Sequence, residues 1–295
     1  MDVIKTSLII AIGVTLYYLL LQWPVDAPTN DMAYSEDIRF NAISDSEPLL
    51  SQPLEPLSSL GESKEGVVSK EKSYYEIKNE NLSLYLDPVT GRFELSRLNT
   101  ISKTKDSQEP FVVLGPTYDE GQNRENIYFA NSGFYTRSQG YLNPEFSKIS
   151  EERTDGGGTV YTLEGSSKGM SFIRKIDIPV TGYKIIVEDV VRSSIEEQVS
   201  VTPYVVIERD GSVVEEGGLM YTYLGPVFSS TKDTYEKYDF DDIRDSSYQN
   251  KSVGGWVALI QHYFLSAWIP DQNEEYLYQG RYGDKSSRYS LGYTS

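Results

Sequence analysis

The apolar residues divide the chain into three stretches, of which the first is a single uninterrupted run. Residues 6–25 carry no charge, and their apolar side chains cover every side of a helix instead of one stripe. A helix of about 20 residues rises roughly 30 Å, which matches the hydrocarbon core of a bilayer. Tyr18 and Trp23 lie toward one end, as interfacial aromatic residues do, and Pro24 ends the helix. The pattern predicts a transmembrane anchor over residues 1–25.

The flanks of this run predict its orientation. Lys5 precedes it and acidic residues follow it, so the positive-inside rule places the N-terminus in the cytoplasm and the rest of the chain on the far side. A cleaved signal peptide is the alternative. Its apolar region would usually be about 7–15 residues long and end in a small-x-small site, whereas this run ends in the bulky residues Leu21, Gln22 and Trp23. The sequence therefore favours an uncleaved anchor.

The second stretch, residues 26–73, shows no sustained period. It is rich in proline, serine and acidic residues, and such a segment cannot bury enough apolar area to offset the entropy of ordering it. We predict a disordered, extended tether. Scattered leucines are the only indication of a docking motif, and a plain linker is the favoured interpretation. These leucines are Leu49, Leu50, Leu54, Leu57 and Leu60.

The third stretch, residues 74–295, alternates apolar and polar positions. Period 2 begins at Ile77, a turn follows at residues 87–91, and the alternation resumes at Phe93. Further strand-like segments are residues 159–163, 171–178, 183–191 and 201–207. Many short strands separated by turns predict a mainly β domain built as a large antiparallel sandwich.

Two local signals refine this picture. Asp210-Gly211 stands between residues 201–207 and the apolar pair Val213-Val214, and Asp-Gly between alternating segments predicts a hairpin. Residues 256–261 are the exception to the β pattern, because their apolar side chains share one helical face.

Composition narrows the class of protein. The net charge of −17 repels phosphate backbones, so nucleic acid is not an expected partner. The 24 tyrosines argue against a wholly disordered chain, and one long apolar run argues against a polytopic membrane protein. The absence of cysteine excludes disulfides, thiolate catalysis and cysteine metal sites.

Candidate chemistry is sparse. His262 is the sole histidine, so a catalytic triad or a multi-histidine metal site would have to use it, and an ordinary edge or surface residue is the favoured interpretation. An acidic cluster suggests calcium, but it lacks the mid-loop glycine of an EF-hand, so a solvated acidic loop is favoured. The cluster comprises Asp239, Asp241, Asp242 and Asp245. Residues 155–158 read DGGG, which predicts a mobile turn and no phosphate loop. No catalytic, cofactor-binding or metal-binding residue is predicted.

The C-terminal third of the chain contains two sequence motifs that are more specific. Residues 234–241 read TYEKYDFD, and residues 254–270 read GGWVALIQHYFLSAWIP. This resembles the first periplasmic domain of the YidC family, the membrane protein insertases of Gram-negative bacteria, in which a YEKY-F segment precedes GGW-A--Q-YF--AWIP. The anchor, the polar linker and the strand pair over residues 82–98 fit the same family. His262 stands where many members carry a different polar residue, which weakens a catalytic role further.

The resemblance implies both a fold and a role. In that family the periplasmic domain is a β-supersandwich similar to galactose-mutarotase-like and sugar-binding folds. The whole protein inserts and folds inner-membrane proteins, alone or beside the Sec translocon, through five later transmembrane helices that carry a charged, hydrophilic groove. Those helices are not in this sequence, and residues 74–295 end slightly before the family's β domain does, so we expect a fragment or a truncated product. Its expected partners are the Sec translocon with its accessory subunits, nascent inner-membrane proteins and the lipid bilayer.

A second hypothesis comes from another functional class. The predicted sandwich and the aromatic content also suit a membrane-tethered carbohydrate-binding or mutarotase-like module. Mutarotase chemistry usually needs a histidine together with a carboxylate, and only His262 is available. A sugar titration would separate the two hypotheses.

Overall fold

A computed structural model describes residues 74–116, 118–119, 124–125, 127–193, 199–211, 223–261, 263–284 and 286–295. The predicted anchor (1–25) and tether (26–73) lie outside these residues. In the part of the chain that is described, no helix has the length and apolar character needed to cross a bilayer. All of the described residues belong to one compact unit.

The largest sheet has ten strands and runs in the order β1-β2-β3-β7-β13-β20-β19-β16, with β4 added to β3 and β8 added to β7. Neighbouring strands are antiparallel throughout the described sheets. The strands of this sheet are β1 (Tyr75–Lys78), β2 (Leu82–Leu86), β3 (Phe93–Ser102), β4 (Pro110–Leu114), β7 (Tyr128–Thr136), β8 (Gly140–Leu142), β13 (Thr202–Asp210), β16 (Tyr248–Val253), β19 (Glu275–Gly283) and β20 (Arg288–Thr294).

Two four-stranded sheets accompany it. One has the order β12-β11-β10-β9 and the other β15-β14-β17-β18, while β5 and β6 form a short ribbon. Their strands are β5 (Tyr118–Asp119), β6 (Arg124–Glu125), β9 (Glu145–Arg153), β10 (Thr159–Ser167), β11 (Met170–Ile178), β12 (Ile186–Ser193), β14 (Leu224–Ser229), β15 (Glu236–Lys237), β17 (Trp256–Gln261) and β18 (Phe264–Trp268). The described helix is α2 (Phe240–Asp245).

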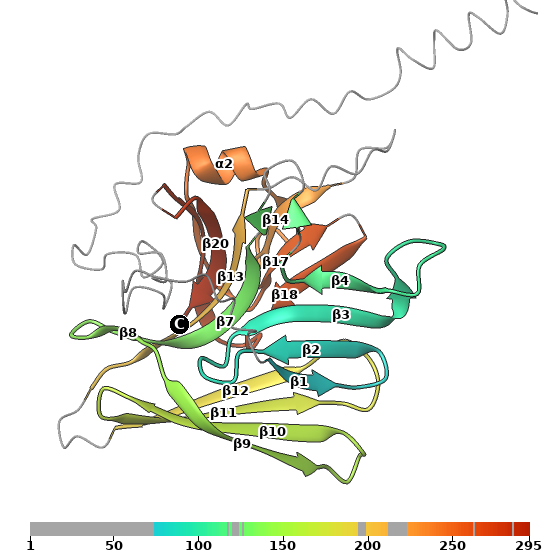
Figure 1. Cartoon of the computed structure of the whole chain (residues 1–295). Helices are drawn as coiled ribbons and strands as arrows, with labels where there is room; N and C mark the ends of the chain where they lie inside the picture. The colour runs from blue at the N-terminus through green and yellow to red at the C-terminus, as the bar shows by residue number, and fades with distance from the viewer. Residues whose placement is uncertain are drawn as a thin grey trace, which may run out of the picture. The chain divides into compact units, whose positions relative to one another are not determined.

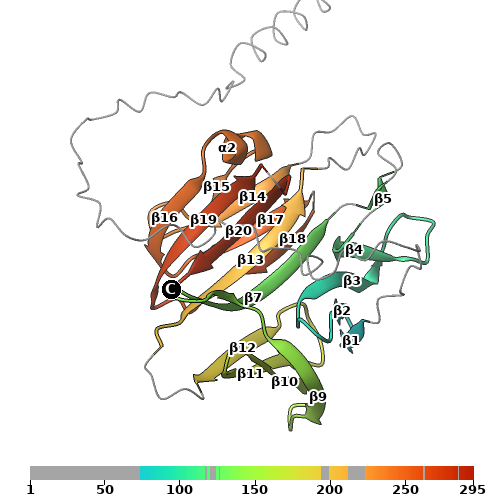
Figure 2. The ribbon, with the colours of Figure 1, turned by 60° about the vertical axis from the view of Figure 1, so that its left-hand side comes forward.

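Both small sheets cover the same face of the large sheet, which we call the inner face (Figures 1 and 2). Side chains two residues apart in a strand share a face. On β7, Phe134 contacts Phe172 of the β9–β12 sheet, with ring centroids 6.0 Å apart, and Tyr128 lines a pocket with Gln261 of the other small sheet. One hydrophobic core therefore joins all three sheets, and it includes Leu86, Phe134, Leu163, Ile176, Ile207, Phe228, Leu259 and Tyr278.

The mainly β, antiparallel class predicted from the sequence is confirmed. The turn at residues 87–91 joins β2 to β3, and its Gly91 adopts φ +69°, a conformation that glycine tolerates. Strands β10 and β11 contain the predicted segments 159–163 and 171–178, whereas β12 begins at Ile186, three residues after the predicted start at Tyr183.

Two local predictions are wrong. In the predicted Asp210-Gly211 hairpin, Val213 and Val214 lie outside the described residues, but β13 already pairs with β7 on one edge and with β20 on the other, so no edge is left for a second hairpin strand. Residues 256–261 are strand β17 and not a helical turn. Its residues Val257 to Ile260 are all buried, because the strand is covered on both faces and so loses the alternation that marks a half-exposed strand.

Candidate functional site

The acidic cluster forms part of a short helix. Asp239 precedes α2, and its backbone N–H donates to the carboxylate of Asp242 at 2.9 Å, as in a capping box. Asp241 pairs with Arg244 one turn later, at 2.7 Å. The carboxylates are exposed, as predicted, but the predicted loop is wrong because these contacts support a helix. Among the residues that the structure describes, no group of three or more acidic or histidine side chains could hold a metal ion.

His262 lies outside the described residues, so its role stays a prediction. The glycine turn at residues 155–158 is present and connects β9 to β10. Thr154 closes it through two backbone hydrogen bonds, donating to Gly158 at 3.0 Å and accepting from Gly157 at 2.9 Å. The prediction of a turn there is confirmed.

The segment 254–270 fastens the β14–β18 sheet to the large sheet. Gly255 adopts φ +96°, and a Cβ there would stand 2.2 Å from the carbonyl oxygen of Ser229. The Tyr278 hydroxyl donates to the Gly254 carbonyl at 2.7 Å. Trp268 donates from Nε1 to the carbonyl of Val206 in β13, at 3.2 Å. These residues hold two sheets together.

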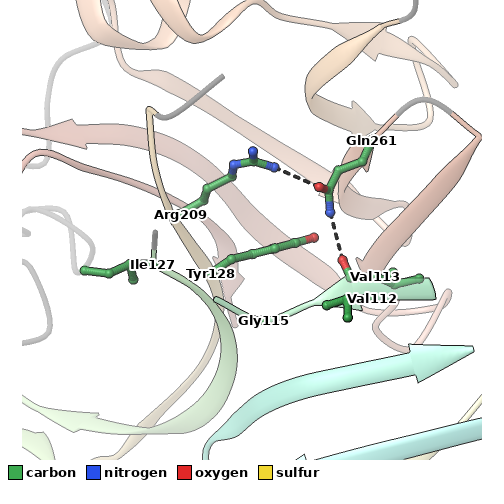
Figure 3. Close-up of a pocket in the computed structure, with 7 residues that line it drawn as sticks. All are labelled: Val112, Val113, Gly115, Ile127, Tyr128, Arg209 and Gln261. Atoms are coloured by element: carbon green, nitrogen blue, oxygen red, sulfur yellow. Dashed lines mark hydrogen bonds between the residues drawn. The ribbon is translucent and has the colours of Figure 1, made fainter. Parts of the chain in front are cut away.

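A small pocket lies where β4, β7, β13 and β17 meet (Figure 3). Gln261 spans it, accepting from Arg209 at 3.1 Å and donating to the Val113 carbonyl at 2.8 Å. The buried hydroxyl of Tyr128 points into the same space and has no hydrogen-bond partner within the part of the chain that the structure describes. Burial raises the pKa of Tyr128 and lowers that of Arg209. The cavity of about 10 Å³ is large enough for about one water molecule and too small for a substrate.

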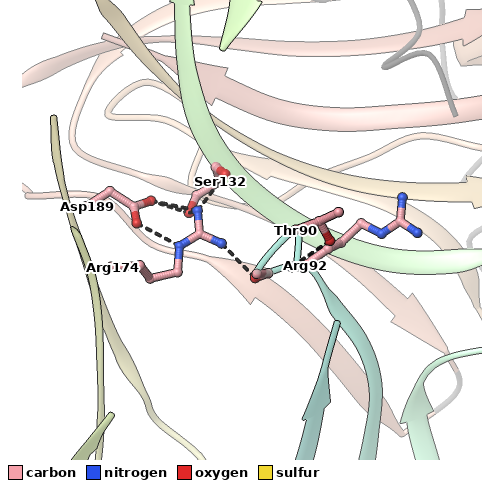
Figure 4. Close-up of polar contacts among 6 residues, drawn as sticks. Thr90, Arg92, Ser132, Arg174 and Asp189 are labelled. Carbon is pink, nitrogen blue, oxygen red and sulfur yellow. Dashed lines mark hydrogen bonds and ion pairs between the residues drawn. The ribbon is translucent and has the colours of Figure 1, made fainter. Parts of the chain in front are cut away.

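A charged cluster ties the β9–β12 sheet to the large sheet (Figure 4). Arg174 of β11 is 2% exposed, and its Nε lies 2.7 Å from Oδ1 of Asp189 in β12. The same guanidinium donates to the carbonyls of Gly91, at 2.7 Å, and of Ser132, at 2.6 Å. The Ser132 hydroxyl in turn donates to Asp189 at 2.5 Å. Every partner is internal, so the cluster acts in packing.

An exposed apolar stripe runs along β18, the edge strand of its sheet. Tyr263 is 81% exposed, Leu265 is 53% exposed and Ile269 is 63% exposed. They alternate with Phe264 and Trp268, which turn toward the protein. Apolar side chains gathered on one exposed face mark a contact surface more often than isolated ones do. We call these three residues the β18 stripe.

Residues 74–295 match a known protein family. The family profile described as "YidC periplasmic domain" matches residues 74–295, which is the whole of the third stretch.

This chain belongs to the YidC family.

The YidC relatives are longer than this chain. "Membrane protein insertase YidC" of Shewanella loihica is 29% identical over 212 residues, covering 70% of this chain and 39% of the relative. The protein of the same name from Cellvibrio japonicus is 30% identical over 230 residues, covering 75% and 40%. That of Pseudomonas entomophila is 27% identical over 317 residues, covering 100% of this chain and 55% of the relative. The chain thus spans from 39% to 55% of the length of these YidC relatives.

The residues that carry the YidC resemblance are mostly packing residues. Gly255 and Trp268 meet backbone atoms of neighbouring strands, and Gln261 joins three strands. The sequence pattern did not single out Arg174 or the polar residues on the opposite face of the large sheet. Arg174 occupies an ordinary place in the alternation of β11, and only its 2% exposure distinguishes it from a solvated residue.

Proposed function

We propose that this chain is the anchor and periplasmic part of a membrane protein insertase, which assists the insertion and folding of inner-membrane proteins alone or with the Sec translocon. The observation that carries the proposal is the match of the YidC periplasmic domain to residues 74–295. The relative from Pseudomonas entomophila, which aligns over the full chain, supports extending it to the N-terminal segments.

The proposal divides the chain into three parts. Residues 1–25 anchor it in the inner membrane with the N-terminus in the cytoplasm, residues 26–73 form a disordered tether, and residues 74–295 form a periplasmic domain. The uncharged run at residues 6–25 supports the anchor. A ten-stranded sheet covered on one face by two smaller sheets supports assigning the domain to the β-supersandwich architecture.

The proposed role involves no covalent chemistry, so the protein acts without catalytic residues or cofactors. Insertion requires a path that lowers the penalty for moving polar segments into lipid, and the family places that path in later transmembrane helices. The domain at residues 74–295 is proposed to hold its position outside the membrane and to contact partner proteins. Its partners are the Sec translocon with its accessory subunits, nascent inner-membrane proteins and the lipid bilayer, and the β18 stripe is the surface we assign to protein partners.

Membrane extraction combined with protease protection tests the topology. Carbonate-washed membranes from cells that express the full chain should retain it, and protease added to spheroplasts should digest residues 26–295. Removal of residues 1–25 from the exported protein should release it into the soluble periplasmic fraction. A full chain that leaves the membrane in carbonate, or that resists protease until the inner membrane is opened, would contradict the proposal.

A further inference from the structure

An exposed patch of large side chains lies at one end of the β14–β18 sheet. In the strand order β15-β14-β17-β18 (Figure 2), Tyr235 comes directly before β15, Trp256 begins β17 and Ile269 follows β18. Tyr235 is 52% exposed and Ile269 is 63% exposed, while Trp256 is half-buried. We call these three residues the Trp256 patch. Its side chains are accessible to a ligand, unlike those of the core.

Strand register brings the three residues into one row. The pairing of β14 with β15 and with β17 places Tyr235 and Trp256 on either side of Ser229, and the pairing of β17 with β18 places Ile269 beside Trp256. Trp268 points inward to β13, so its neighbour Ile269 points outward. The rings of Tyr235 and Trp256 have centroids 6.1 Å apart. Since neighbouring strands lie about 4.8 Å apart, the row spans roughly 14 Å.

The chemistry of this patch suits a proline-rich, acidic peptide. Exposed Trp and Tyr side chains bind segments in the polyproline II conformation, because proline rings pack on flat aromatic faces. The N–H of Trp and the O–H of Tyr donate to peptide carbonyls, which polyproline II leaves without internal hydrogen bonds. Lys237 adds a positive charge beside the patch, since its exposed Nζ lies 5.4 Å from the ring centroid of Tyr235 and 4.9 Å from that of Tyr223.

The tether of this chain contains one segment of that kind. Residues 47–60 read EPLLSQPLEPLSSL, and of the 13 prolines in the chain only Pro53 and Pro56 are three residues apart. Polyproline II has three residues per turn, so these two prolines share one edge of such a helix. Glu55 falls on another edge. The remaining edge carries the scattered leucines of the tether, namely Leu54, Leu57 and Leu60.

We propose that residues 53–57 of the tether dock on the Trp256 patch of the same chain. The two prolines of a polyproline II turn lie about 9 Å apart, which matches the two strand spacings, roughly 10 Å, between Tyr235 and Trp256. Glu55 then pairs with Lys237. The docked segment covers Ile269, which also belongs to the β18 stripe. The contact does not rest on the proposed insertase role, because both partners belong to this chain.

The length of the tether allows the contact. Residues 58–73 connect the segment to the domain and extend to roughly 50 Å at about 3.1 Å per residue. A domain of this length has a radius of gyration of about 17 Å, and so a diameter of roughly 45 Å. The segment therefore reaches the patch wherever the tether enters the domain. A linked segment also has an effective concentration in the millimolar range, so a weak affinity is sufficient.

Two other arrangements fit less well. Addition of the tether as a strand to the edge of β18 would need backbone N–H groups, which Pro53 and Pro56 lack. Self-association through the Trp256 patch would bury three partly exposed side chains on each copy, far less than the roughly 1,000 Å² that a stable interface needs. A short proline-rich segment needs neither a free sheet edge nor a large interface.

Pulsed electron paramagnetic resonance on the full chain in lipid nanodiscs tests the proposal. The chain has no cysteine, so spin labels attach only to the introduced Ser59→Cys and Thr234→Cys. We expect a short, narrow component in the distance distribution between the two labels. Substitution of both Pro53 and Pro56 by serine should abolish this component, because the segment loses its ring faces and its preorganised conformation. Tyr235→Ser should abolish it from the side of the domain.

Matched controls separate docking from general effects of substitution. Substitution of Pro28 and Pro48 by serine changes two other prolines of the tether, and Tyr183→Ser removes a tyrosine that is also 52% exposed but lies before β12. Both controls should retain the short component. Ile269→Ser provides a second patch variant should Tyr235→Ser fold poorly, and it should also abolish the component.

Four results would overturn the proposal. The first is a parent chain without a short component, and the second is a component that survives the substitution of Pro53 and Pro56 or survives both patch variants. The third is an equal loss in the controls. The fourth is a component that disappears when the labelled chain is diluted with excess unlabelled chain, because the contact would then join two copies.

Discussion

Among single residues, Arg174 contributes most clearly to the join between sheets. Its guanidinium bonds to Asp189 in the neighbouring strand, to the carbonyl of Gly91 in the β2–β3 turn and to the carbonyl of Ser132 in the large sheet. A buried charge is tolerated only where its partners replace water completely. Because these groups come from the β9–β12 sheet on one side and from the large sheet and its β2–β3 turn on the other, the cluster fixes how the two sheets meet.

Replacing this residue gives the first prediction. Arg174→Met should lower the free energy of unfolding by about 3–5 kcal/mol, because it leaves the Asp189 carboxylate without its counter-charge. Urea unfolding of the full chain in micelles, followed by fluorescence, measures the loss. The control is Lys148→Met, which breaks the exposed Lys148–Glu164 pair and should change stability by about 0–1 kcal/mol. Equal losses in the two variants would contradict the assigned role of Arg174.

Glu208 gives a prediction about pH. Burial raises its pKa from 4.5 to about 7, although Arg288 and Arg92 act in the opposite direction. Between these two pH values the folded state holds a proton that the unfolded state has lost, so the contribution of Glu208 to stability falls as pH rises from about 4.5 to 7. Glu208→Gln removes this dependence. The difference in melting temperature between the variant and the parent should therefore favour the variant more at pH 8 than at pH 5, and an unchanged difference would contradict the assignment.

At the scale of elements, the alternation of apolar residues predicted several of the strands that have one solvated face, but not β9, β16 or β18. The turn at residues 87–91 and strands β10 and β11 follow directly from it. The pattern failed at β17, because burial of both faces removes the alternation. Strand β13 was predicted, but the hairpin after it was not found, because neighbours distant in sequence, β7 and β20, occupy both edges of β13.

The buried polar residues on the face of the large sheet away from the two small sheets were missed for a different reason. Gln279 and Arg281 occupy alternate positions in β19, as solvated residues of any strand do. Only the register across β19, β20 and β13 shows that they stand beside Glu208. Sequence spacing within one strand contains no information about that neighbour, so these buried polar contacts follow only from tertiary structure.

The turn between β16 and β17 gives a prediction at this scale. Gly255→Ala should destabilise the protein by more than about 1–2 kcal/mol, the usual penalty for a left-handed alanine, because its Cβ would also meet the Ser229 carbonyl oxygen 2.2 Å away. Gly182→Ala is the control, since Gly182 has nearly the same φ, +97° against +96°, and no atom within 4 Å of its Cβ position. Urea unfolding of both variants should show the larger loss for Gly255→Ala, and equal losses would contradict the steric account.

At the scale of the whole molecule, the described domain has one covered sheet face and one exposed apolar edge. The inner face is covered by two small sheets and is joined to them by Arg174 and Trp268. The β18 stripe remains exposed on an edge strand, within the segment by which the chain resembles YidC proteins. The role that we propose for this domain is to serve a membrane protein insertase by contacting its partners.

Site-specific photo-cross-linking in living cells tests that claim most directly. A photoreactive phenylalanine analogue at Leu265, in the β18 stripe, should form adducts that contain an accessory subunit of the Sec translocon or a nascent inner-membrane protein, identified by mass spectrometry. The same analogue at Lys148, an exposed position of β9 on another sheet, should form neither adduct. Absence of both adducts at position 265, or equal yields at the two positions, would contradict the account.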